Sequence, residues 1–269
     1  MYGVFKMEFE NLFDLSEAFK TNILISGANA SGKTRLSCAI ASMLHRLGYK
    51  VLVFDVSGIW KSVSDLPYYT KYYHGIGISK LITSGIYDLS TLKLKEARAY
   101  VEALLNNLWN QRINQVDNRP MFLVFEEAET YLRNIRSIEK SGEVYRMVHV
   151  GRNKPIRVRS ILISTDLAQI DCSIIRLCGI RFHGFLHIEE NSKRKFKSYY
   201  GKDYQYIASN DLESGDFIRL HKRKLDIVTV PLFQPKTTPQ LYIQHYAERQ
   251  QPQVRQPKQT IIEKLRAIF

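Results

Sequence analysis

The chain is organised around Gly27-Ala28-Asn29-Ala30-Ser31-Gly32-Lys33-Thr34, which reads G-x-x-x-x-G-K-T. The apolar run 23–25 precedes this stretch, as a buried strand would. Apolar residues at helical spacing follow it, and Gly48 stands where a C-terminal cap would fall. These apolar residues are Leu36, Ala39, Ile40, Met43, Leu44 and Leu47. The spacing therefore predicts a strand, a tight loop and a helix in succession.

The residue types of residues 27–34 match the requirements of phosphate binding. Glycines let backbone N–H groups curl around phosphate oxygens, and the N-terminus of the following helix adds its positive dipole end. Lys33 supplies a point charge to the β and γ phosphates, and the Thr34 hydroxyl is placed to bind Mg²⁺. All eight residues are thus predicted to hold a nucleoside triphosphate, ATP with Mg²⁺. The alternative is a glycine-rich turn that binds nothing.

Length and composition set broad limits on the class of protein. The 269 residues can bury one large α/β core with or without appendages, and the 45% hydrophobic content is ordinary for a globular protein. No run approaches the roughly 18 to 20 apolar residues of a membrane span, and the N-terminus lacks a signal-peptide profile. We therefore expect a cytoplasmic protein without a membrane span, in the host cytoplasm if it is viral.

The charged residues and the cysteines give weaker indications. A formal net charge of +13 favours a polyanionic partner, either nucleic acid or an acidic membrane surface, although solubility alone is an alternative reason for it. Three cysteines show no metal-ligand spacing, and Cys38 is predicted to be a small core residue.

The region from residue 20 to about 190 alternates strand and helix patterns. Together these patterns predict an α/β fold with a central, mostly parallel sheet flanked by helices. The predicted strands are 51–54, 121–125, 161–163 and 180–186. The predicted helices are 92–113 and shorter stretches near 128–137 and 141–150, whereas 60–90 has the composition of irregular excursions.

The residue composition and the hydrophobic pattern change towards the C-terminus. Apolar segments 217–220 and 225–228 flank His221-Lys222-Arg223-Lys224, which predicts a hairpin. Residues 234–259 are rich in Gln and Pro and predict an extended arm, and 261–269 has the pattern of a short amphipathic helix. The predicted organisation is a lead-in at 1–19, a P-loop domain at 20–232 and a C-terminal arm at 233–269.

Glu126 and Glu127 are the strongest candidates for hydrolysis chemistry. They directly follow the predicted strand 121–125, and ATP hydrolysis needs one carboxylate near Mg²⁺ and another that polarises the attacking water. We assign Glu126 to the metal and Glu127 to the role of catalytic base. The alternative is an ordinary acidic helix start, because Ala128 onward has a helical pattern.

Two further segments carry polar candidates. Ser164-Thr165-Asp166 follows the predicted strand 161–163, and Thr165 or Asp166 could sense the γ-phosphate and orient the attacking water; a polar loop start is the alternative. Arg152 follows a predicted helix and could stabilise transition-state charge in a neighbouring subunit. The alternative is a cationic helix cap or a DNA-contacting loop with Arg157 and Arg159.

These segments together resemble the HerA/FtsK superfamily of DNA-pumping ATPases, which includes the genome-packaging ATPases of double-stranded DNA viruses. The matching pieces cover about residues 20 to 230: the P-loop 27–34, 54–58 with its D-x-x-G turn, 124–128, and 151–153 followed by 161–165. The resemblance implies a RecA/HerA-FtsK type fold and a ring, often a hexamer, with ATP between subunits. It also implies double-stranded DNA, held without sequence specificity, in the central channel.

The chain departs from the family pattern at several points. The family usually has Asp where Glu126 stands and Gln where Asp166 stands; Gln169 is nearby but displaced. Because the P-loop begins after only 26 residues, we expect no N-terminal barrel of the kind that cellular members carry. This compactness looks more like a viral or mobile-element packaging ATPase, which could dock on a capsid or portal-like component.

The basic clusters and the competing functions complete the sequence-based hypotheses. Residues 193–197 and 221–224 could contact DNA phosphates, but each cluster alone is more often a solvated surface. The alternatives to DNA packaging are an ATPase for filamentous virion assembly, which normally carries a transmembrane segment, and one for conjugation-type DNA transfer. A P-loop small-molecule kinase and a nucleotide-gated binding module are further alternatives.

Overall fold

The computed structural model describes residues 15–69, 84–114, 120–133, 142–186, 190–209 and 211–230. Most of the predicted lead-in and the whole of the predicted arm 233–269 lie outside these residues, as does the part of the predicted helical stretches at 134–141.

A mostly parallel sheet forms the centre of the described part of the chain. Its nine strands run in the order β3-β4-β2-β5-β6-β1-β7-β8-β9. Neighbours from β3 to β7 are parallel, and β8 and β9 are added antiparallel. The bounds are β1 (Asn22–Ser26), β2 (Lys50–Asp55), β3 (Tyr68–Tyr69), β4 (Gly85–Asp88), β5 (Met121–Phe125), β6 (Val158–Ser164), β7 (Cys178–His183), β8 (Asp216–His221) and β9 (Lys224–Thr229).

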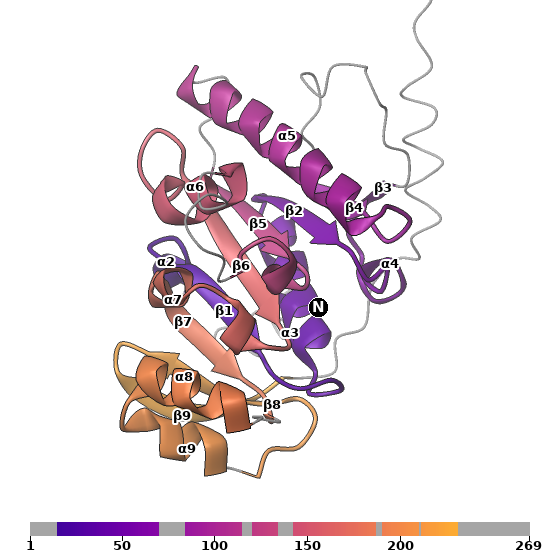
Figure 1. Ribbon diagram of the computed structural model, residues 1–269. Helices are drawn as coiled ribbons and strands as arrows, with labels where there is room; N and C mark the ends of the chain where they lie inside the picture. Colours follow the sequence, from indigo (N-terminus) through magenta and orange to yellow (C-terminus); the bar gives the residue numbers. More distant parts are fainter. Residues whose placement is uncertain are drawn as a thin grey trace, which may run out of the picture.

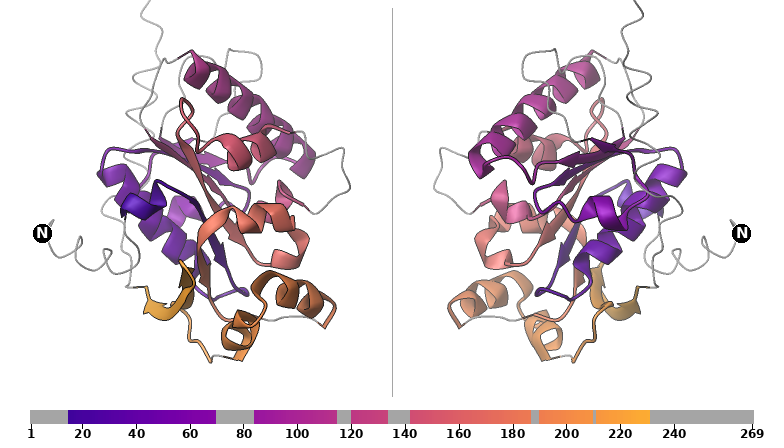
Figure 2. Two further views of the ribbon diagram at one scale, coloured as in Figure 1. Left: turned by 90° about the vertical axis from the view of Figure 1, so that its left-hand side faces the viewer. Right: turned by 90° about the vertical axis from the view of Figure 1, so that its right-hand side faces the viewer.

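Helices cover both faces of the sheet (Figures 1 and 2). They are α2 (Leu15–Ala18), α3 (Lys33–Arg46), α4 (Trp60–Val63), α5 (Leu94–Ile113), α6 (Glu143–Val150), α7 (Cys172–Arg176), α8 (Glu190–Tyr200) and α9 (Asp203–Ser209), with the 3₁₀ turns η1 (Ala128–Thr130) and η3 (Leu167–Gln169). Among the described helices none combines the length and apolar character needed to cross a bilayer.

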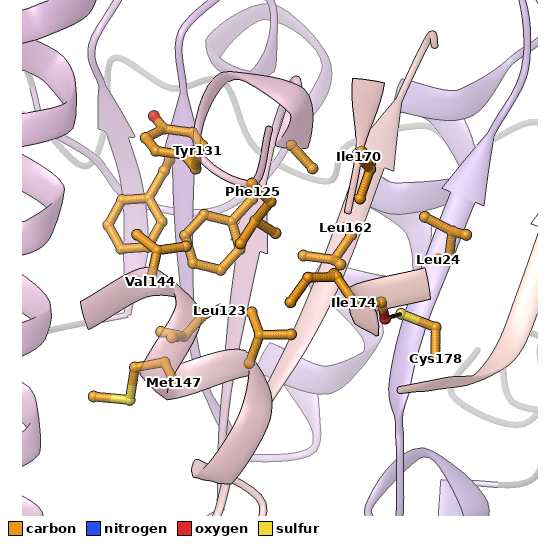
Figure 3. Packing of buried hydrophobic residues seen from close by; sticks show 14 of the residues in the cluster. Leu24, Leu123, Phe125, Tyr131, Val144, Met147, Leu162, Ile170, Ile174 and Cys178 are labelled. Carbon is orange, nitrogen blue, oxygen red and sulfur yellow. Dashed lines mark hydrogen bonds between the residues drawn. The ribbon is translucent and has the colours of Figure 1, made fainter. Parts of the chain in front are cut away.

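Alternating strand residues build a separate hydrophobic core on each face of the sheet. Leu24, Leu123 and Leu162 pack on the side of α5 to α9, as Figure 3 shows for part of that cluster. Their neighbours Ile25 and Val124 pack on the opposite side with α3. Because the parallel strands are buried on both faces, they read as continuous apolar runs rather than as alternating patterns.

The predicted α/β fold is confirmed, and several of its details are corrected. The strand 121–125 has its predicted bounds, Cys38 is fully buried, and Gly48 follows α3 with a φ of 85°. In the described part of the helix expected from Ala128, residues 128–133, only the 3₁₀ turn η1 forms, and Glu127 before it has a left-handed backbone.

Other corrections concern regions of weak apolar signal. The region 60–90, expected to be irregular, contains α4, β3 and β4. The strand expected at 180–186 is β7, which begins earlier and ends at His183. The sequence analysis also missed α8 and α9, whose many charged and polar residues hide their apolar stripe.

A buried polar pair joins β1 to β7 where both strands end. The His183 Nδ1 and Ser26 Oγ atoms are 2.7 Å apart, and the His183 ring packs edge-on against Tyr200 with centroids 4.9 Å apart. Burial, followed by the nearby Arg181 charge, lowers the pKa of His183 to about 3. His183 is therefore neutral in the folded protein at all but strongly acidic pH.

This pair predicts a loss of stability on acidification. Between the unfolded pKa of about 6.5 and the folded pKa of about 3, the unfolded chain binds a proton at His183 that the folded chain does not. This term lowers the free energy of unfolding by about 2 kcal/mol between pH 7 and pH 5. Urea unfolding across this pH range should show a shallower pH dependence in His183→Asn than in the wild type. His149→Asn is the control, and an unchanged slope in His183→Asn would contradict the assignment.

Candidate functional site

Three loops converge because β1, β6 and β5 are parallel neighbours that end at one edge of the sheet (Figure 1). Ser26 of β1 pairs with Ser164 of β6, and Phe125 of β5 pairs with Leu162 of β6. The P-loop, the segment 126–130 and the segment 165–169 therefore leave the sheet side by side. The end of β6 lies between the other two.

The P-loop conformation depends on its glycines and on a brace from the C-terminal hairpin. Gly32 has a φ of 94°, and a side chain there would also approach the Gly215 nitrogen to 3.1 Å. The Ser214 hydroxyl donates to the Ala30 carbonyl at 2.7 Å, and the Gly215 N–H donates to the Ser31 carbonyl at 3.1 Å. The segment before β8 thus holds the loop from outside.

A cavity of about 460 Å³ lies where the three loops meet. It is lined by Asn29, Ala30, Gly32, Lys33, Thr34, Arg35, Ser57, Ile59, Glu126, Glu127, Ile163, Ser164 and Thr165. Five of the eight predicted P-loop residues line this space; Gly27, Ala28 and Ser31 complete the loop. The predicted acidic pair and Thr165 face the same cavity.

The Lys33 side chain spans the P-loop. Its Nζ donates to the Ala28 carbonyl at 2.9 Å. Burial lowers the pKa of Lys33, and the charges of Glu126, Glu129 and Glu127 oppose that effect. A lysine ammonium group is thus held close to three glutamate carboxylates.

Glu126 is a buried carboxylate with a specific donor. Its Oε2 accepts a hydrogen bond from the Trp60 indole at 2.8 Å, and the residue is only 6% exposed. Burial raises the pKa of Glu126 to about 7, and the Trp60 hydrogen bond opposes this shift. A cation bound at this carboxylate would favour its ionised form.

The turn after β2 positions Trp60. Asp55 is fully buried, and its Oδ1 accepts from the Ser57 hydroxyl at 2.7 Å and from the Gly58 N–H at 2.9 Å. Its Oδ2 accepts from the Trp60 N–H at 3.0 Å. The predicted D-x-x-G turn therefore reaches Glu126 through Trp60, a residue the sequence analysis missed. A tryptophan two residues beyond that turn was the available signal.

Glu127 occupies an uncommon backbone conformation. Its φ of 51° and ψ of 60° place a residue with a side chain in the left-handed region, which costs of order 1–2 kcal/mol. This twist ends the run of β5 and leaves the Glu127 carboxylate lining the cavity. Burial, then the nearby Glu129 charge, raises the pKa of Glu127, as suits a proton acceptor.

Thr165 and Asp166, the two residues predicted to sense the γ-phosphate, make different contacts after the end of β6. Thr165 lines the cavity, and its hydroxyl donates to Glu129 Oε1 at 2.8 Å. Asp166 instead caps η3, accepting from the Ala168 N–H at 2.9 Å and from the Gln169 side chain at 3.0 Å. Glu129 falls within the predicted helical stretch near 128–137, and the sequence analysis gave it no role. A third acid in the run E-E-A-E was its only signal.

The residues present fit a magnesium ion bound together with phosphates. Thr34 and Glu126 line one cavity and offer the oxygen ligands that Mg²⁺ prefers. The described residues contain no group of three or more His, Cys, Asp or Glu side chains able to hold a metal by themselves. A few protein ligands completed by phosphates and water is the usual arrangement for Mg²⁺.

Arg152 lies at the opposite edge of the sheet. It follows α6 and precedes β6, and the Val158 N–H donates to the Gly151 carbonyl at 2.7 Å where β6 begins. The seven residues of β6 span roughly 20 Å between that point and Thr165. The structure therefore does not bring Arg152 to the cavity of its own chain.

Comparison with known proteins identifies the fold. No protein-family model matches the chain, and no curated protein matches its sequence. Among solved structures, the genome packaging NTPase B204 from Sulfolobus turreted icosahedral virus 2, in complex with AMPPCP, is similar with a TM-score of 0.60 and 12% identity. The match covers 79% of this chain and 99% of that one.

Two further solved structures share this similarity. The DNA-packaging ATPase B204 from Sulfolobus turreted icosahedral virus has a TM-score of 0.59 and 13% identity, over 79% of this chain and 98% of that one. Thermomonospora curvata EccC (ATPases 2 and 3), in complex with a signal sequence peptide, has a TM-score of 0.51 and 16% identity, over 81% of this chain and 39% of that one. At these identities the comparison establishes the P-loop NTPase fold.

The Trp60–Glu126 hydrogen bond predicts a measurable stability difference. Trp60→Phe keeps the aromatic ring but leaves the buried Glu126 oxygen without its donor, so the free energy of unfolding should fall by about 2 kcal/mol in urea denaturation. Trp109→Phe is a matched control, because the buried Trp109 Nε1 has no hydrogen-bond partner among the described residues. Equal losses in the two variants would contradict this account of Trp60.

Proposed function

We propose that this protein is an ATP-hydrolysing motor that translocates double-stranded DNA during packaging of a viral or mobile-element genome in the cytoplasm. The observation that carries the proposal is the convergence of the P-loop, Glu126 with Glu127, and Thr165 on one cavity. A phosphate cradle alone would support only nucleotide binding. A carboxylate beside that cradle adds the base that hydrolysis needs.

In this proposal Glu127 acts as the general base. It accepts a proton from a water molecule whose oxygen attacks the γ-phosphorus, while the bond from that phosphorus to the β–γ bridging oxygen breaks to release ADP. Lys33 stabilises the charge on the β and γ phosphate oxygens. Thr34 and Glu126 would hold Mg²⁺, which supplies further charge neutralisation at those oxygens.

Fold and charge together favour DNA as the cargo. The chain shares its fold, over nearly the full length of the neighbour, with a genome packaging NTPase. Its net charge of +13 suits a polyanion. Helix α8 adds exposed basic side chains, including Arg194 and Lys197, and its Lys195 Nζ donates to the Ala168 carbonyl at 3.2 Å. A basic surface is thereby linked to the turn that follows Thr165.

The position of Arg152 favours action between subunits. The cavity of the same subunit lies at the opposite end of β6, so Arg152 would reach a phosphate only in a neighbouring subunit. That arrangement requires a closed or repeating head-to-tail assembly, and a ring, with six subunits as the proposed number, is the closed form. A ring around DNA would also explain contact without base readout.

The central experiment measures ATP hydrolysis with and without long double-stranded DNA. DNA should stimulate the wild type. Lys33→Ala and Glu127→Gln should each lower turnover at least about a hundredfold, and Glu127→Gln should still bind ATP. Hydrolysis that ignores DNA, with the phosphate passed to a small acceptor molecule, would show a kinase instead.

The role of α8 is tested in the same assay. Arg194→Gln with Lys197→Gln should weaken DNA binding and reduce the slope of log affinity against log salt by up to about two. Basal hydrolysis without DNA should be unchanged. Lys95→Gln with Arg176→Gln removes the same charge from exposed positions elsewhere and serves as the matched control. Equal effects of the two pairs would mean that only net charge matters.

Complementation tests Arg152 as a residue supplied by the neighbouring subunit. Arg152→Ala alone and Glu127→Gln alone should both be inactive. Mixed assemblies should regain hydrolysis, because a Glu127→Gln subunit still offers Arg152 to the intact base of its Arg152→Ala neighbour. Steady-state turnover of mixtures over a range of ratios measures this. Activity that never exceeds the sum of the separate variants would refute action between subunits.

A further inference from the structure

Glu129 connects the two loops that carry the proposed base and the proposed sensor. It lies on η1, and its Oε1 accepts from both the Thr165 hydroxyl at 2.8 Å and the Thr165 N–H at 3.3 Å. The strands before these loops, β5 and β6, are paired in register. A single carboxylate oxygen thus fixes both the backbone and the side chain of Thr165 relative to the end of β5.

This contact determines which hydrogen-bonding role Thr165 offers to the cavity. A hydroxyl has one proton to donate and two lone pairs that accept. Because the proton of Thr165 is directed at Glu129, the side of its Oγ1 that lines the cavity can only accept. Phosphate oxygens are also acceptors, so a γ-phosphate is an unsuitable partner. Water, which has two protons to donate, is a suitable one.

The second oxygen of Glu129 argues against a purely structural link. Glu129 Oε2 is buried and has no hydrogen-bond partner among the described residues. A buried unpaired carboxylate oxygen lowers stability, so a residue that served stability alone would not leave one. The carboxylate also contributes negative charge near Lys33 and Glu127.

We propose that Glu129 is a positioning residue that fixes the Thr165 hydroxyl as the hydrogen-bond acceptor for the attacking water. The inference rests on the ATP hydrolysis of the proposed function and requires neither DNA nor a ring. The water donates one hydrogen bond to Glu127 and one to Thr165 Oγ1, which leaves an oxygen lone pair for the γ-phosphorus.

The step balances without a further reactant. The water oxygen bonds to the γ-phosphorus as the bond to the β–γ bridging oxygen breaks, and the proton facing Glu127 passes to that carboxylate. The second water proton stays on the new phosphate oxygen. Thr165 keeps its own proton throughout, so it orients the nucleophile and exchanges nothing.

A double-mutant cycle on turnover tests the coupling. Glu129→Ala and Thr165→Val should each lower kcat on the order of tenfold, through misplacement of the water, and leave affinity for a non-hydrolysable ATP analogue unchanged. The double variant should be no slower than Thr165→Val alone, because Glu129 acts only through Thr165. Multiplying effects, or a raised KM with kcat unchanged, would overturn the proposal.

Substitutions at Glu129 separate geometry from charge. Glu129→Gln should retain most of the turnover, because its amide oxygen can accept the same hydrogen bond. Glu129→Asp keeps the charge but is one methylene shorter, so it should fall with Glu129→Ala. The reverse order would overturn the proposal. Glu143→Ala on α6 is the control for loss of a half-buried glutamate, and thermal unfolding of each variant confirms folding.

A binding measurement keeps this test separate from the proposed function. If DNA fails to stimulate hydrolysis, the translocase is refuted, but the double-mutant cycle on Glu129 and Thr165 can still be measured. If the wild type does not turn over, the cycle is read from affinity for ADP–aluminium fluoride, which mimics the phosphoryl group with the attacking water in place. Glu129→Ala should weaken that affinity on the order of tenfold relative to the ATP analogue. Equal weakening of both ligands, or of neither, would overturn the role of Glu129.

Discussion

The parallel pairing of β1, β6 and β5 obliges three loops to share one space at the edge of the sheet. With β6 in the middle, the residue after its end lies between the phosphate cradle and the acidic pair. A register shift of one residue would turn the paired side chains of these strands to the opposite faces and expose the core that both helix layers cover. The same pairing that buries Leu162 and Ile163 therefore also sets the distance between Lys33, Thr165 and Glu127.

This arrangement places the carboxylate of Glu126 in a buried position, away from water. Burying the Glu126 charge is costly, and the structure offsets the cost with a donor that is itself secured. Asp55 holds the Trp60 backbone through a fully buried side chain, and Trp60 donates to Glu126. These bonds join the ends of β2 and β5, which are also neighbours in the sheet. Hydrogen bonds between polar side chains thus link neighbouring strands where they end, as apolar contacts link the same strands in the core.

The parts of this site that follow from local chemistry could be predicted from the sequence. The P-loop, its helix and the pair after residues 121–125 depend on patterns a few residues long. The contacts of Trp60 and Glu129 could not, because both depend on which strands are neighbours, and strand order leaves no mark in a local pattern. The strand β3, which contains Tyr68, and the helix α8 were not predicted for a different reason. Their segments are rich in polar and charged residues, and their structure depends on packing against the sheet.

The strand β6 connects the two ends of the proposed catalytic arrangement. Its first residue, Val158, is bonded to the Gly151 carbonyl beside Arg152, and its last, Ser164, precedes Thr165. Parallel partners hold it on both sides, and six of its seven residues are buried, so it behaves as a rigid spacer. Within a subunit, the segment that would contact a neighbour's ATP therefore stands at a fixed distance from the segment that lines its own cavity. A displacement of Thr165 along the strand would therefore displace Arg152 as well, and the reverse also holds. Helix α8 is attached through Lys195 to the turn after β6, so it would move with them. In the proposed assembly, coupling between sites would therefore need no rearrangement of the sheet, only its movement as one body.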